Sequence, residues 1–153
     1  MKRCIAWILT ALAAAGCATP PVTPKRWYPE VNARGDALAT VFESRIPCLD
    51  CQAIKFGLAL YRGRDGAPST YRMARVYVAK GNERTVNEGA WSVARGTKLD
   101  PQAPLVQLDG NAPAEFRAFW VIGENILFIL DRDLSPRVGT AGYGYALNRV
   151  NLR

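Results

Sequence analysis

Two cysteines three positions apart, Cys48 and Cys51, are the residues of this sequence best suited to chemistry. They follow Pro47 and stand just before a run in which apolar and other residues alternate. The chain of 153 residues contains no histidine, so Ser-His-Asp and Cys-His catalysis are excluded. Two thiols at this spacing could form a disulfide, bind a soft metal ion or take part in thiol–disulfide exchange.

The amino-terminal residues indicate the compartment that these thiols meet. Lys2 and Arg3 precede a short apolar run that ends in small residues and Cys17. This pattern is typical of a secretory signal, and the run is shorter than the roughly 20 residues that a membrane-spanning helix needs. The segment "LAAAGC" also resembles a bacterial lipobox, although Ala14 stands where the strict pattern has leucine. We therefore predict a lipoprotein signal peptide over residues 1–16.

Cys17 is the predicted site of lipidation, and an ordinary secretory signal with a coincidental cysteine is the alternative. Two acyl chains on the sulfur and a third on the new amino terminus would suffice for stable membrane anchoring. Export also narrows the roles of the other cysteines, because Cys4 leaves with the signal and only Cys48 and Cys51 remain as thiols. Neighbouring thiols in an oxidising compartment tend to pair.

The cysteine pair keeps several interpretations open. A disulfide across so short a loop contributes only about 2 kcal/mol in the chain-entropy estimate, so a chemical role stands beside a plain structural one. Two thiolates suit Cu(I), and Met73, the one methionine of the mature chain, could add a weak thioether ligand. Structural zinc would need two further sulfur or nitrogen ligands, which the mature chain lacks once Cys4 is removed and Cys17 carries lipid. Cu(I) is thus the one candidate cofactor, and a site without any metal is the alternative.

Catalysis by the pair is not predicted. A thioredoxin-like oxidoreductase carries its cysteines at the start of a helix in a βαβ unit. The residues after Cys51 alternate with a period of two instead, so the helix is missing from the pattern. With no acid–base pair and no phosphate-binding loop elsewhere, we expect a protein that is not an enzyme.

The rest of the sequence predicts what must position the pair. Residues 17–37 are rich in proline and lack periodicity, which indicates a lipidated, flexible tether. A recognition segment around Trp27 and Tyr28 is the alternative for this stretch. About eight short alternating runs separated by turns follow over residues 38–153, with no helical period. They predict an all-β domain, either an antiparallel up-and-down β-barrel or a sandwich.

The protein is moderately basic. The formal net charge is +7, and removal of the signal with Lys2 and Arg3 lowers it by two. The basic residues are scattered rather than clustered in a run, which is typical of a solvated face with mild attraction to anionic lipid surfaces. No nucleic-acid-binding motif is present, so nucleic acid is not an expected partner.

The most specific segment of the sequence is "PCLDC" followed by an alternating strand, and a Gly-x-Trp strand and a "LxxLD" strand come later. Taken in this order, these segments resemble the N-terminal domain of the NlpE family of copper-homeostasis and envelope-stress lipoproteins. The residues that carry the resemblance lie within about residues 40–135 and are Pro47, Cys48, Cys51, Gly89, Trp91, Leu127, Leu130 and Asp131.

This resemblance implies a small barrel of lipocalin-like shape, and it implies a function in copper binding or resistance, or in envelope-stress sensing. It implies a place on the outer membrane, on the periplasmic side or exposed at the surface, because Ala18 after the lipidated cysteine does not favour inner-membrane retention. The expected partners are the membrane, through the lipid, and an envelope sensor or assembly protein. The alternative function is a structural envelope lipoprotein whose cysteine pair is merely a disulfide.

Overall fold

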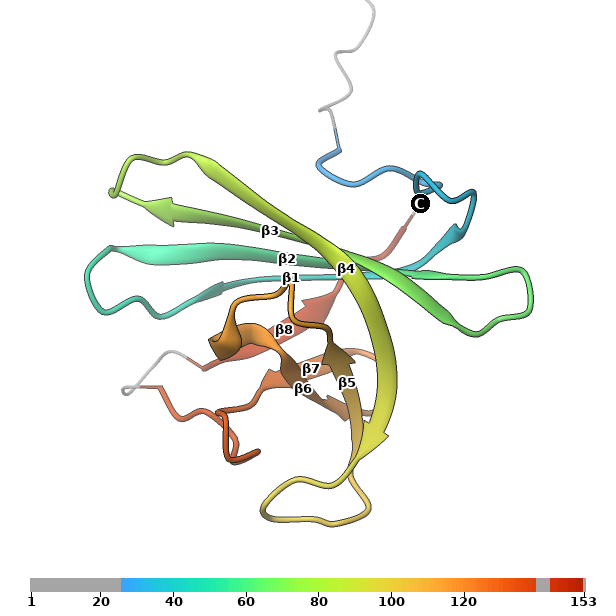
Figure 1. The fold of residues 1–153 in the computed structure, drawn as a ribbon. Coiled ribbons are helices and arrows are strands. Elements are labelled where there is room, and N and C mark those ends of the chain that lie inside the picture. The colour runs from blue at the N-terminus through green and yellow to red at the C-terminus, as the bar shows by residue number, and fades with distance from the viewer. Residues whose placement is uncertain (1–25, 140–143, 153) are drawn as a thin grey trace, which may run out of the picture.

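The computed structural model describes residues 26–139 and 144–152. In this part of the chain, eight antiparallel strands pair in chain order and close into a barrel (Figure 1). The elements are β1 (Ala37–Ile46), β2 (Ala53–Arg62), β3 (Pro68–Val78), β4 (Arg84–Arg95), β5 (Pro104–Leu108), a 3₁₀ turn η1 (Ala114–Phe116), β6 (Ala118–Ile122), β7 (Ile126–Ile129) and β8 (Ala146–Arg149). The predicted all-β, up-and-down barrel of about eight strands is confirmed, and the sandwich alternative is excluded.

Closure depends on β8, which pairs with β1 at Phe42–Arg149 and Glu43–Asn148. The backbone N–H of Val150 extends this seam by donating to the carbonyl of Val41 at 2.8 Å. Closing the sheet leaves no unpaired strand edge there for another chain to join. None of the described helical segments is long and apolar enough to cross a membrane.

The interior of the barrel is filled with apolar side chains. The period-two alternation of β2 places Ile54, Phe56, Leu58 and Leu60 inside, each at most 7% exposed. Phe56 meets Phe116 and Phe119 in ring contacts, with centroids 5.0 and 6.3 Å apart. These aromatic residues therefore belong to the packed core, as expected for a barrel of this strand number.

Trp91 on β4 is part of the core and is bonded to β2, the strand on the other side of β3. It is 6% exposed, and its indole Nε1 donates to the carbonyl oxygen of Tyr61 at 2.8 Å. The guanidinium of Arg62 lies 4.9 Å from the centre of its ring. A buried tryptophan needs such a partner for its N–H, and here the backbone of β2 supplies it.

Gly89 is required because a carboxylate occupies the space where a side chain would stand. Asp109 accepts hydrogen bonds from the backbone N–H groups of Ala90 at 2.9 Å and Asn111 at 3.1 Å, and from the hydroxyl of Tyr71 at 3.3 Å. A Cβ atom at Gly89 would overlap this carboxylate. Burial, together with Asp109, raises the pKa of Tyr71 well above its usual range, so its hydroxyl stays a donor.

We expect Gly89→Ala to lower the free energy of unfolding by roughly 2 kcal/mol, because it displaces Asp109 and breaks hydrogen bonds to a charged group. Urea denaturation followed by circular dichroism measures the change. Gly110→Ala is the matched control, since a Cβ atom there would meet no neighbour. An equal loss in both variants would contradict this reading of the Gly-x-Trp motif.

The end of the predicted tether packs on the outside of the barrel. Tyr28 is only 9% exposed and lies against Val41, Ala59 and Tyr61. The Tyr61 hydroxyl donates to the carbonyl of Pro29 at 2.9 Å. Residues 26–36 are thus held by aromatic packing on small side chains, which a proline-rich composition alone does not show. The predicted signal peptide, Cys17 and the first part of the tether lie outside the described residues.

Candidate functional site

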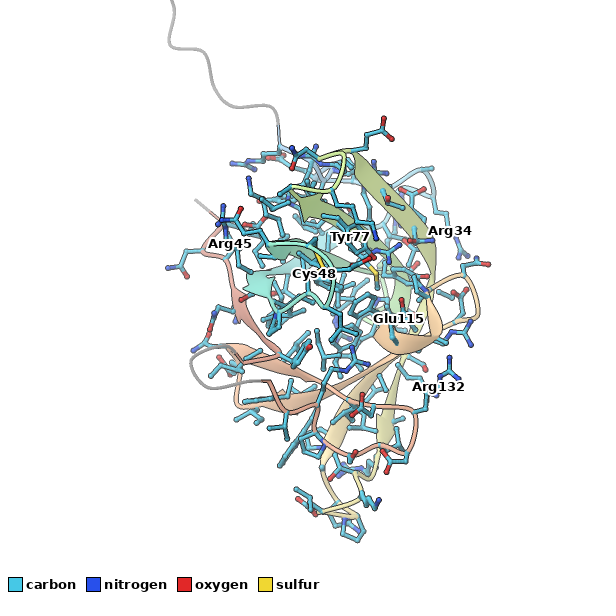
Figure 2. The ribbon with its side chains drawn as sticks, turned by 90° about the vertical axis from the view of Figure 1, so that its left-hand side faces the viewer. Arg34, Arg45, Cys48, Tyr77, Glu115 and Arg132 are labelled. Carbon is cyan, nitrogen blue, oxygen red and sulfur yellow. A yellow bond between two sulfur atoms is a disulfide. The ribbon has the colours of Figure 1, made fainter. Side chains whose placement is uncertain are left out.

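Cys48 and Cys51 lie in the loop between β1 and β2, at one end of the barrel (Figure 2). They form a disulfide, with their Cα atoms 5.3 Å apart, inside the usual range for such bonds. Both are half-buried and pack against the barrel core. The pair is therefore anchored to the folded body and still partly accessible to solvent.

The cysteine loop is attached to the neighbouring β3–β4 turn. The backbone N–H of Gln52 donates to the carbonyl of Val78 at 3.1 Å. Asp50 forms an ion pair with Lys80, and the hydrogen bond from Lys80 lowers the pKa of the Asp50 carboxyl. Figure 1 shows the two connections side by side at the same end of the barrel. A change in the conformation of the cysteine loop would therefore alter its contacts with the β3–β4 turn.

The ligand atoms of Cys48, Asp50 and Cys51 lie within 4.8 Å of one another. Their chemistry is mixed, because two sulfurs are soft donors whereas the carboxylate is hard and already engaged by Lys80. Thiolates exist only after the disulfide is reduced. The donor set therefore fits a soft metal ion such as Cu(I) held by two sulfurs, and only in the reduced state.

Met73 is not brought to this site. It is fully buried inside the barrel, on β3, where its register partners are Leu58 and Asn87. It stands five residues along β3 from Val78, the residue that contacts the cysteine loop, and a strand rises about 3.3 Å per residue. The structure thus places Met73 about half of β3 away from the residue that contacts the cysteine loop.

Sequence reasoning missed Arg75, which is buried in the same barrel (6% exposed). Its guanidinium donates to the Asn87 Oδ1 atom at 2.7 Å and to the Tyr77 hydroxyl at 3.1 Å, while its Nε has no partner. It also lies 5.6 Å from the ring centre of Phe116. Among the described residues no carboxylate pairs with it. The sequence pattern could have predicted its burial, because Arg75 stands two residues from both Met73 and Tyr77. In a strand with a period of two, these three residues share one face.

A second arginine, Arg137, also lies close to the ring of Phe116. Arg137 lies 5.7 Å from the ring centre of Phe116 and 5.3 Å from that of Tyr145. Unlike Arg75, it has an acidic partner, because its Nε donates to Asp131 at 2.7 Å. The aromatic residues of this end therefore pack against guanidinium groups rather than only against each other.

A closed antiparallel barrel with a paired Cys-x-x-Cys at one end is the class of domain that these observations define. The family model of the NlpE N-terminal domain matches residues 42–139, more than half of the chain, and the chain belongs to this family. The resemblance seen in the sequence is thereby confirmed. No match was found among curated proteins.

The solved structures that are similar to this chain include the following two. One is a putative lipoprotein from Shewanella oneidensis, 20% identical, with a TM-score of 0.46, covering 73% of this chain and 88% of its own. The other is the Cpx pathway activator NlpE from Escherichia coli, 20% identical, with a TM-score of 0.44, covering 69% of this chain. The match spans 48% of the Escherichia coli protein.

We expect reduction of the disulfide to lower the free energy of unfolding by about 2 kcal/mol, since it removes a restraint on the unfolded chain. Urea denaturation with and without dithiothreitol measures the difference. The double variant Cys48→Ser, Cys51→Ser is the control and should give one midpoint under both conditions. A wild-type midpoint that does not respond to the reductant would show that the bond adds nothing to stability.

Proposed function

We propose that this protein is a lipid-anchored, outer-membrane NlpE-type lipoprotein that binds copper or senses envelope stress through Cys48 and Cys51. The observation that carries the proposal is the placement of the pair. The two cysteines are half-buried at one end of the barrel, and their loop is attached to the β3–β4 turn by Gln52 and by the Asp50–Lys80 ion pair. A chemical change at the sulfurs can therefore alter the surface formed by two connections.

The chemistry has two states. Two electrons and two protons from a thiol reductant convert the disulfide into two thiols, and loss of the protons gives thiolates that would hold Cu(I). Oxidation reverses these steps and removes the ligands. In the disulfide state the loop is attached to Val78 and Lys80, so these contacts would carry a shift of Cys48 or Cys51 to the neighbouring turn.

The same proposal includes the location of the protein and its partners. Lipid on Cys17 places the domain on the periplasmic side of the outer membrane or at the cell surface. An envelope sensor or an assembly protein is the proposed partner, nucleic acid is not one, and no enzymatic activity is assigned. The absence of histidine from the whole sequence supports the last assignment, because it removes the usual general base.

A structural lipoprotein is the second candidate. The observation that favours it is that both cysteines pack against the barrel core in the disulfide form, as a passive bridge would. In that case the domain would serve as a scaffold or assembly partner, and the pair would only brace the loop between β1 and β2.

Copper binding separates the two candidates. We expect the mature chain carrying Cys17→Ala to bind one Cu(I) per molecule when reduced and none when oxidised, because only thiolates are soft ligands here. Competition with a chromophoric Cu(I) chelator under anaerobic conditions measures the stoichiometry. Cys48→Ser, Cys51→Ser should abolish binding, and Met73→Leu should leave it unchanged. Equal Cu(I) uptake by the wild-type sequence and the double serine variant would leave the structural candidate.

Lipidation is tested by intact mass. The protein extracted from membranes should have lost residues 1–16 and gained a diacylglyceryl group and an amide-linked acyl chain on Cys17. Cys17→Ala should abolish the added mass and release the protein from the membrane fraction. A wild-type protein of unacylated mass would refute the anchor and leave the copper measurement unaffected.

A further inference from the structure

A groove of about 420 Å³ crosses the outer face of the barrel over β1, β2, β3 and the start of β4. Its lining includes three basic residues, Arg45, Lys55 and Arg84, all exposed. In the described part of the chain, none of the three has an ion pair or a side-chain hydrogen bond. The groove is therefore a place where positive charge is available to a partner.

The strand register places these charges in one row. Arg45 is paired directly with Lys55, Lys55 with Val76, and Val76 with Arg84. Neighbouring strands are about 4.8 Å apart, so the three charges span four strands at one level of the barrel. Like charges directly opposite each other, as at Arg45–Lys55, destabilise a sheet. An anionic partner would offset that repulsion.

The adjacent row consists of small or apolar residues apart from Glu43. The register runs from Glu43 to Gly57, then to Ala74 and Val86. The only acidic side chain of this row, Glu43, accepts a hydrogen bond from the indole N–H of Trp27. A basic row beside an apolar floor suits a ligand with a negative head and an apolar body.

Trp27 forms one wall of the groove and marks where the tether joins the barrel. Its ring lies directly against Gly57, and its carbonyl accepts a hydrogen bond from Arg72 at 3.0 Å. Cys17 precedes Arg26 by nine residues, which span at most about 30 Å when extended. A lipid on Cys17 would therefore hold the membrane surface within reach of this face.

We propose that this groove docks the domain on the anionic phospholipid headgroups of the membrane that carries its anchor. The orientation of the domain relative to the membrane depends on the proposed lipidation of Cys17. The attraction to anionic headgroups depends on Arg45, Lys55 and Arg84 alone. Each basic residue close to an anionic lipid surface strengthens binding about fivefold. Three together are worth roughly a hundredfold, and the attraction weakens as salt rises.

The test measures co-sedimentation of the mature chain carrying Cys17→Ala, which has no lipid of its own. The probes are vesicles of phosphatidylethanolamine with phosphatidylglycerol, and vesicles of phosphatidylcholine alone. The groove variant combines Arg45→Gln, Lys55→Gln and Arg84→Gln. We expect binding to the anionic vesicles only, and a loss of roughly a hundredfold in the groove variant.

The matched control removes the same charge elsewhere, through Arg64→Gln, Arg95→Gln and Arg132→Gln, all at exposed positions. It should keep most of the binding. Equal loss in both variants, or no binding of the unmodified groove to anionic vesicles, would overturn the proposal. Binding to a polyglutamate peptide without binding to vesicles would overturn it too, in favour of an acidic protein partner. Because the chain in this assay is unlipidated, failure here would leave the anchor at Cys17 unaffected.

Discussion

The pairing of β8 with β1 is the constraint on which the other features depend. Once the sheet is closed, each strand has one face toward a common interior and one toward solvent. The interior takes the apolar face of β2, and the exterior takes the row that begins with Arg45 and Lys55. The loops are left at the two ends, where the Cys48–Cys51 pair lies. A sheet left open at this seam would expose the edges of β1 and β8 to other chains.

Two features of the barrel carry charge where charge is costly. Arg75 is buried with neutral partners, and burying an ion without a counter-charge is unfavourable, so its bonds to Asn87 and Tyr77 and its contact with Phe116 compensate only in part. On the outside of the barrel, Arg45 and Lys55 are directly opposite each other on the adjacent strands β1 and β2. The same hairpin, β1 with β2, carries this basic pair and is connected by the cysteine loop. The cysteine loop and the Arg45–Lys55 pair are thus parts of one hairpin.

Membership of the NlpE N-terminal domain family fits this arrangement, because the most specific residues of the sequence resemblance, Pro47, Cys48 and Cys51, all lie in that connecting loop. The barrel fixes where the loop stands and which turn it contacts. The chemistry of the pair is then a matter of redox state: the disulfide offers no metal ligand, whereas two thiolates offer a soft one.

The sequence by itself determined that the domain is all-β and built from a succession of short strands, because alternation is a local property. Residue types alone also singled out Cys48 and Cys51 as the candidate site and excluded histidine chemistry. Only the tertiary structure decided that Met73 lies away from the pair, that Arg75 points inward, and that Arg45 stands opposite Lys55. These outcomes depend on the register between strands distant in sequence, and a slip by one residue would turn every side chain to the other face. Register is fixed by loop geometry and by closure of the whole barrel, which no single segment encodes.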